Sequence, residues 1–145
     1  MQRRMSQGFE QCIKERKLVR INSDNDLILK ELNAAKFDLK TAQKSAQEGN
    51  FKWATIQAYY SMFHTAKALV LSRGYREKSH LCLSTALKHL FVDAEILEQR
   101  HYLNFRDCMM LREDADYGLV YSADSTDGAI SWASEFLQKA RDVLF

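Results

Sequence analysis

The sequence predicts an all-α protein, an antiparallel up-and-down bundle of about five to six helices. Its 145 residues include no proline and only five glycines, so little turn material is available for a sheet. Hydrophobic residues make up 46% of the chain, and the abundant Ala, Leu, Met and Lys favour helices. This length suits one ordinary domain with a single hydrophobic core. We therefore expect one bundle domain.

A basic leader is expected at residues 1–22, ahead of a bundle domain that spans residues 23–145. Apolar residues recur at helical spacing in this leader, which predicts a short amphipathic helix. They are Met5, Phe9, Cys12 and Ile13.

Charge is unevenly distributed along the chain, although the net charge is only +2. Residues 1–20 carry six basic and two acidic residues, whereas residues 107–127 carry one basic and six acidic residues. Such asymmetry can steer a charged partner or help two copies associate, but solvated helix faces are the simpler explanation. The small net charge does not indicate a general nucleic-acid binder.

Two long helices are predicted after the leader. Ser23 or Asp24 is expected to cap the first of them, which runs to about residue 48 and ends at Gly49. The second is expected over residues 50–74 and should be the central helix of the core. Its inward-facing residues are predicted to be Trp53, Ile56, Tyr59, Tyr60, Met62, Phe63 and Val70.

Three further helices complete the predicted bundle. Ser79 is expected to cap a helix that ends near residue 91. A long helix follows over about residues 93–118, and Ser125 or Thr126 caps the last one. In the long helix, the residues predicted to face inward are Ile96, Leu97, Leu103, Met110 and Leu111.

The three cysteines are predicted to be small apolar core residues. Cys12, Cys82 and Cys108 are odd in number, widely spaced and without a CxxC pair, so neither a disulfide nor a zinc site is expected. No apolar run approaches the length of a membrane span, and no signal-peptide core follows the first residues. We expect a cytoplasmic protein without membrane contact, metal or cofactor.

An unusual polar motif at residues 112–118 forms the C-terminal turn of the long helix. It places one guanidinium, three carboxylates and a phenol where acids oppose the helix dipole, at a cost of a few tenths of a kcal/mol per charge. A functional role of the motif could explain why this cost is tolerated. The structural alternative is an i,i+4 ion pair between Arg112 and Asp116, worth about 0.3 kcal/mol.

Three segments together resemble the HEPN domain family, named for nucleotide binding in higher eukaryotes and prokaryotes. They are Ala-Tyr-Tyr-Ser-Met-Phe-His at residues 58–64, Lys-Ser-His at residues 78–80, and Arg-x-x-Ala-Asp-Tyr at residues 112–117. The resemblance covers about residues 27–144 and is greatest to the small stand-alone archaeal and bacterial members.

That resemblance implies a helical bundle, frequent homodimers, and often a neighbouring gene for a minimal nucleotidyltransferase. Many members are toxins of toxin–antitoxin pairs that cleave RNA without metal, using an Arg followed after four to six residues by a His. Arg112 matches this arginine, but Tyr117 is the first residue in the window where the histidine is expected. A tyrosine, with an ordinary pKa of about 10, is a poor base at pH 7.

Three routes would restore chemistry to the motif. First, His80 or His64 could come from another helix or from a dimer mate. Second, carboxylates could bind Mg²⁺; these are Asp107, Glu113, Asp114 and Asp116, although residues 113, 114 and 116 do not all share one helical face. Third, Tyr117 or Tyr121 could accept a nucleotide from a transferase, as the resemblance allows.

Three functional hypotheses follow. The first is a binding module for a nucleotide, an RNA phosphate or a nucleotidyltransferase partner. The second is a metal-independent endoribonuclease toxin, and the third is a structural scaffold. The candidate catalytic residues are Arg112, His80 and Tyr117, and the candidate ligand-binding residues are Lys78, His64, Tyr60, Asp114 and Asp116.

Two spatial predictions accompany these hypotheses. Arg112 should face an open groove that it shares with Lys78 and His80. The surface of a homodimer should include apolar residues, for which Tyr59, Met62 and Leu119 are candidates.

Overall fold

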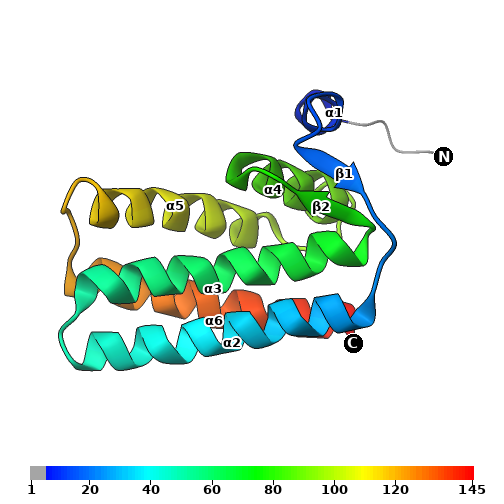
Figure 1. The fold of residues 1–145 in the computed structure, drawn as a ribbon. Helices are drawn as coiled ribbons and strands as arrows, with labels where there is room; N and C mark the ends of the chain where they lie inside the picture. Colours follow the sequence, from blue (N-terminus) through cyan, green and yellow to red (C-terminus); the bar gives the residue numbers. More distant parts are fainter. Residues whose placement is uncertain (1–5) are drawn as a thin grey trace.

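The computed structural model describes residues 6–145, and over this range six α-helices and one small sheet form the fold (Figure 1). The helices are α1 (Gln7–Lys14), α2 (Asn25–Gln47), α3 (Phe51–Ser72), α4 (His80–Leu87), α5 (Gln99–Asp116) and α6 (Ala123–Leu144). The strands are β1 (Leu18–Arg20) and β2 (Tyr75–Glu77), and a π-helical turn, η1, spans Lys88–Val92. The predicted all-α bundle is confirmed.

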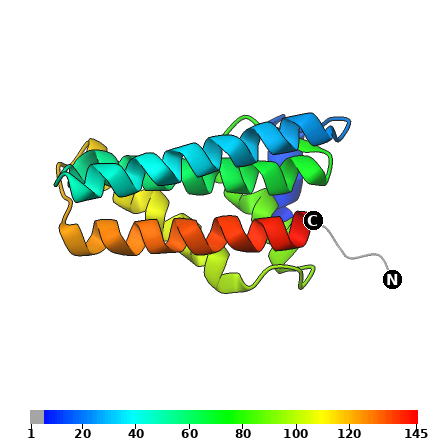
Figure 2. The same ribbon diagram turned by 90° about the horizontal axis from the view of Figure 1, so that it is seen from below.

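Helix α3 is the centre of the bundle. It packs against α2, α5 and α6, and these four long helices lie side by side (Figures 1 and 2). Tyr59, Phe105 and Phe136 contribute fully buried rings from α3, α5 and α6. The short helices α1 and α4 lie with the sheet at one end of this arrangement (Figure 1).

The boundaries of α2 agree with the sequence pattern. The Asp24 side chain accepts a hydrogen bond of 2.8 Å from the backbone N–H of Asp26, so Asp24 is the cap. Gly49 follows the helix with φ of +79°, a conformation that costs glycine little.

The last helix begins earlier than predicted. Ser122 caps α6 in a reciprocal capping box with Ser125, so the prediction that Ser125 or Thr126 is the cap was wrong. The Thr126 hydroxyl is instead buried 2.8 Å from the hydroxyl of Thr55 on α3. A tertiary hydrogen bond therefore decides the role of this threonine.

The start of the long helix was also predicted wrongly. Helix α5 begins at Gln99 rather than near residue 93, because η1 and a turn precede it. The carbonyl of Phe91 accepts hydrogen bonds from the backbone N–H groups of Ile96 and Leu97, at 2.8 and 3.0 Å. Leu97 is thus buried by a turn, although its spacing looked helical.

No pattern in the sequence indicated the two-stranded sheet. Strand β1 pairs antiparallel with β2, and Leu18 lies opposite Glu77. Each strand has three residues, too few to show an alternating pattern. The pairing ties the leader to the segment between α3 and α4.

A disulfide joins Cys12 of α1 to Cys82 of α4, which corrects the prediction that all three cysteines are free. The two residues are 70 positions apart, so no local spacing could reveal the bond. Cys108 is free and buried, as predicted, and burial raises the pKa of its thiol to about 12.

Several predicted positions of apolar residues were wrong. Trp53, Leu103 and Met110 are exposed rather than inward-facing, while Tyr59 and Met62 are fully buried and cannot belong to a dimer surface. Met5, predicted for the first helix, lies outside the described residues.

Within residues 6–145, no helix is both long enough and apolar enough to cross a membrane.

Candidate functional site

Arg112 lies in the last turns of α5, against two neighbouring tyrosines of α3. Its Nη2 donates a hydrogen bond of 3.1 Å to the Tyr60 hydroxyl. The guanidinium carbon lies 5.7 Å from the centre of the Tyr59 ring and 5.6 Å from that of Tyr60, within the range of cation–π attraction. The side chain is 18% exposed. Arg112 is thus held by aromatic rings at the edge of the core.

The acidic neighbour of Arg112 pairs with it only weakly. The Asp116 Oδ2 atom lies 3.9 Å from Nη2, beyond ordinary hydrogen-bond distance. Such an i,i+4 pair is worth about 0.3 kcal/mol. On the other side, the exposed ring of Tyr117 has its centre 5.9 Å from the guanidinium carbon. The guanidinium therefore lacks a tight carboxylate partner.

His80 reaches the same two tyrosines from the first turn of α4. The capping Ser79 accepts a hydrogen bond from the backbone N–H of Cys82, which fixes the start of this helix. The His80 Nδ1 atom lies 2.6 Å from the Tyr59 hydroxyl oxygen, and its ring centre lies 4.5 Å from that of Phe63. The imidazole is thus oriented by one hydrogen bond and a stack of rings.

The hydrogen bond between Tyr59 and His80 determines which imidazole nitrogen carries the proton. Burial raises the pKa of Tyr59 far above its usual value, so the phenol keeps its proton. Within residues 6–145, His80 Nδ1 is the one hydrogen-bond partner of this buried hydroxyl, and a buried O–H needs an acceptor. Nδ1 therefore accepts, and Nε2 carries the proton in the neutral ring.

His80 is neutral at pH 7. Burial, assisted by the positive charge of Arg112, lowers the pKa of this imidazole. Its Nε2 has no hydrogen-bond partner in the described chain and is not a buried atom. Arg112 and His80 thus present N–H donors beside the same pair of tyrosines. We call Tyr59, Tyr60, His80, Arg112 and Tyr117 the Arg112 cluster.

Two other candidate residues stand apart from this cluster. Lys78 is exposed, and its backbone N–H extends the sheet by donating to the Lys17 carbonyl. Asp114 is exposed, and its carbonyl accepts a 2.9 Å hydrogen bond from the Val120 N–H. No described contact joins either side chain to Arg112 or His80.

His64 belongs to a separate ionic network between α2 and α3. Its Nδ1 lies 2.6 Å from a Glu31 oxygen, and its Nε2 lies 3.6 Å from Asp38. Burial would raise the pKa of Glu31, but the hydrogen bond from His64 and the charge of Lys67 outweigh it and lower that pKa. Both imidazole nitrogens thus lie near carboxylates, and only Glu31 is within hydrogen-bond distance.

The sequence did not identify Tyr59 as a member of the site, or Phe63 as a neighbour of His80. Both were read as core residues, because they follow the apolar pattern of α3. The one available signal was the pair of consecutive tyrosines at residues 59 and 60, since neighbours on a helix point about 100° apart. One ring can then enter the core while the other borders the surface.

The structure offers no support for a carboxylate metal site. Asp107, Glu113 and Asp114 are exposed at the surface of α5. Over residues 6–145, no three His, Cys, Asp or Glu side chains are grouped so that they could hold a metal ion.

Comparison with known proteins agrees with this arrangement of helices and motifs. The HEPN domain family matches residues 29–144. This chain belongs to the HEPN domain family. The match covers almost the same range as the sequence resemblance, and it includes α3, α4 and α5, which carry the Arg112 cluster.

Two individual proteins are similar to this HEPN chain. A UPF0332 protein of Archaeoglobus fulgidus is 31% identical over 115 residues, which cover 73% of this chain and 86% of the relative. The crystal structure of TT1696 from Thermus thermophilus has a TM-score of 0.64 at 20% identity, covering 80% of this chain and 97% of the other. At that identity, the likeness to TT1696 concerns the fold alone.

Proposed function

We propose that this HEPN domain binds a phosphate group of a nucleotide or of RNA at the Arg112 cluster. The observation that carries the proposal is the hydrogen bond between Tyr59 and His80, which leaves Nε2 of His80 as a donor. A guanidinium and an imidazole N–H beside the same two tyrosines suit the oxygens of a phosphate. The exposed ring of Tyr117 adds a flat surface against which a base can stack.

RNA cleavage is a second candidate, supported by one observation. Arg112 and His80 come from different helices and contact the same tyrosines, so a base from another helix does lie near the motif arginine. To act as a base, however, His80 would need Nε2 free of its proton. That tautomer places the proton on Nδ1 and leaves the buried Tyr59 hydroxyl without an acceptor. Binding is therefore the better-supported function.

An apolar stripe next to the cluster favours a homodimer as part of this proposal. Leu103 and Met110 of α5 and Tyr117, the residue that follows this helix, recur every seven residues and are 48%, 64% and 76% exposed. Seven residues are close to two helical turns, so the three side chains lie along one face. A second copy that covers this face would bring two Arg112 clusters close together.

The cellular setting is proposed from family membership. The HEPN resemblance implies that the chain acts in the cytoplasm as part of a toxin–antitoxin pair, with a nucleotidyltransferase as its partner. Co-purification of a neighbouring gene product with this chain would support it, and the Met110→Glu variant would show whether the apolar stripe serves that partner or a second copy.

Binding can be tested by fluorescence anisotropy with a short single-stranded RNA and by titration with a 5′-nucleotide. Arg112→Gln should weaken binding about tenfold or more, because it removes a charge-assisted contact to phosphate. Arg106→Gln is a matched control, since Arg106 lies on the same helix and donates a 3.1 Å hydrogen bond to another tyrosine, Tyr102. Equal binding by both variants and the unmodified protein would reject the proposal.

The same samples separate the other two hypotheses. Intact RNA after long incubation with the unmodified protein supports binding, whereas cleavage that disappears in His80→Gln supports the ribonuclease. A severe loss of thermal stability in Arg112→Gln with unchanged RNA binding would identify the motif as structural.

A further inference from the structure

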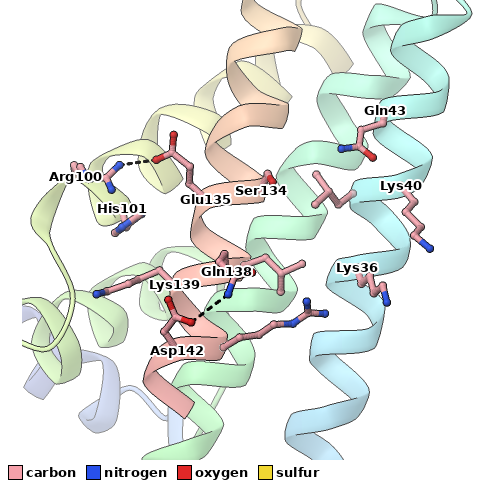
Figure 3. A pocket seen from close by; sticks show the side chains of 13 residues that line it. Lys36, Lys40, Gln43, Arg100, His101, Ser134, Glu135, Gln138, Lys139 and Asp142 are labelled. Atoms are coloured by element: carbon pink, nitrogen blue, oxygen red, sulfur yellow. Dashed lines mark hydrogen bonds and ion pairs between the residues drawn. The ribbon is translucent and has the colours of Figure 1, made fainter. Parts of the chain in front are cut away.

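A second candidate site lies on another face of the bundle, away from the Arg112 cluster. A hollow of about 670 Å³ extends over α6, with α2 on one flank and the start of α5 on the other (Figure 3). None of the five cluster residues lines it. Its volume is in the range of small-ligand sites.

The two flanks of this hollow differ in charge. The α5 flank carries two cations, Arg100 and Lys139, and two acids, Glu135 and Asp142, so that its charge is balanced (Figure 3). Arg100 donates a 2.6 Å hydrogen bond to Glu135, which closes this flank with an ion pair. The Asp142 carboxylate accepts a hydrogen bond of 3.1 Å from Gln138.

The α2 flank is purely cationic. Lys36 and Lys40 lie one turn apart on α2 and line the hollow together with Arg141 of α6. Arg141 lies one turn after Leu137, whose side chain packs into the apolar cluster formed with α2, so helical spacing turns Arg141 toward α2. No acidic residue lines this flank.

These three cations have no carboxylate partner. Within residues 6–145, no Asp or Glu oxygen lies within 4.0 Å of the charged groups of Lys36, Lys40 or Arg141. Like charges at i,i+4 on a helix repel by a few tenths of a kcal/mol. An anion between α2 and α6 would remove this repulsion.

The shape of the charged region indicates a compact anion rather than an extended strand. The gap between α2 and α6 continues past Gln43 into a smaller hollow of about 320 Å³. That continuation is lined by uncharged residues and by Asp127, so the positive charge ends after about one helical turn. No Phe, Tyr or Trp lines either hollow to stack on bases, which the binding of single-stranded nucleic acid commonly uses.

We propose that Lys36, Lys40 and Arg141 form a binding site for a small ligand that carries two or three linked phosphate groups. Three cations from two helices match such a chain in charge, and Gln43 and Gln138 in the same hollow can donate hydrogen bonds to its oxygens. The site is separate from the Arg112 cluster, to which neither α2 nor α6 contributes a residue.

Isothermal titration with inorganic triphosphate, orthophosphate and ATP tests this proposal. Triphosphate should bind at least about tenfold more tightly than orthophosphate, since it engages more than one cation. ATP that binds as tightly as triphosphate identifies the phosphate chain as the recognised group. ATP that binds more tightly than triphosphate would show that the nucleoside also contacts the protein. Either of these two ATP results supports the site.

Matched variants locate the binding. The double variant Lys36→Gln/Lys40→Gln should lose about tenfold or more in triphosphate affinity, whereas Lys30→Gln/Lys44→Gln removes two charges of α2 outside the hollow and should change it little. Likewise Arg141→Gln should weaken binding, and Lys139→Gln, on the other flank of α6, should not. Arg112→Gln should retain triphosphate binding, so this test is independent of the proposed function.

Three outcomes would overturn the proposal. They are equal affinities for orthophosphate and triphosphate, equal losses in the two double variants, and an affinity for single-stranded RNA that rises with length and depends on Lys36 and Lys40. The last result would assign the surface to a nucleic-acid backbone.

Discussion

The four-helix core and the end formed by α1, the sheet and α4 share one hydrophobic cluster, but the second region has additional links of other kinds. In the core, amphipathic helices bury rings and aliphatic side chains around α3. At the other end, Phe9, Leu18 and Leu83 join the same cluster, and a disulfide, three-residue strands and the hydrogen bond between Tyr59 and His80 add further connections. These links join residues far apart in the sequence.

The Arg112 cluster lies where these two regions meet. Arg112, Tyr59 and Tyr60 come from the core, whereas His80 comes from the disulfide-linked end. The spacing between the two N–H donors therefore depends on both regions. Changing the links of the second region tests how far the site depends on them.

Removal of the disulfide should have the largest effect on stability. For a bond that closes a loop of 70 residues, the chain-entropy model gives about 4 kcal/mol. We expect Cys12→Ser/Cys82→Ser to lower the free energy of unfolding by about 2–4 kcal/mol in urea denaturation. It should also weaken RNA binding at the Arg112 cluster, because α4 carries His80, while the affinity of the α2–α6 site for triphosphate stays the same.

A reducing agent provides the control for that experiment. It should destabilise the unmodified protein and leave the double serine variant unchanged. Equal stability of the reduced and oxidised protein would mean that packing alone holds α1 on α4.

The Tyr59→Phe variant should have a smaller effect, about 1 kcal/mol, because it removes one hydrogen bond and retains the buried ring. Its more specific result concerns His80, whose Nδ1 loses its donor. Nitrogen chemical shifts should show the Nε2–H tautomer of His80 in the unmodified protein and a mixture of tautomers in the variant. Tyr102→Phe on the surface of α5 should leave the tautomer unchanged, and a mixture already present in the unmodified protein would contradict our assignment.

The smallest predicted effect is on the pH dependence of stability. Burial lowers the pKa of His80, and burial together with the charge of Arg100 lowers that of His101. The unfolded chain then binds protons more readily than the folded one, so stability is complete above the ordinary histidine pKa of about 6.5 and falls as the pH decreases below it. Melting temperatures between pH 8 and 5 should show this fall, and His80→Gln should reduce it. A flat profile would contradict the prediction.

The fold could be predicted well where apolar spacing was long and regular. The extents of α2 and α3 follow from such patterns and from Asp24 and Gly49 at the ends of α2. The start of α5 could not be predicted, because the Phe91 carbonyl stabilises a turn whose apolar residues repeat at helical spacing. The strands and the disulfide left no local pattern at all.

The candidate site was predicted only in part. Arg112, His80, Tyr60 and Tyr117 were chosen from motifs, and the structure brings all four together. His64, chosen from the same helix as Tyr60, lies between Glu31 and Asp38 instead. His64 contacts acids and His80 contacts tyrosines because different elements pack against them. A single sequence does not show which elements those are.

By itself, the sequence determined the helical class, the central helix and membership of the HEPN domain family, because helical periodicity and short motifs are local properties of the chain. The tertiary structure decided which residues meet: Tyr59 contacts His80, Cys12 bonds to Cys82, and Arg141 lines the same hollow as the two lysines of α2. These residues come together only when helices pack, and packing depends on the whole core rather than on any one segment.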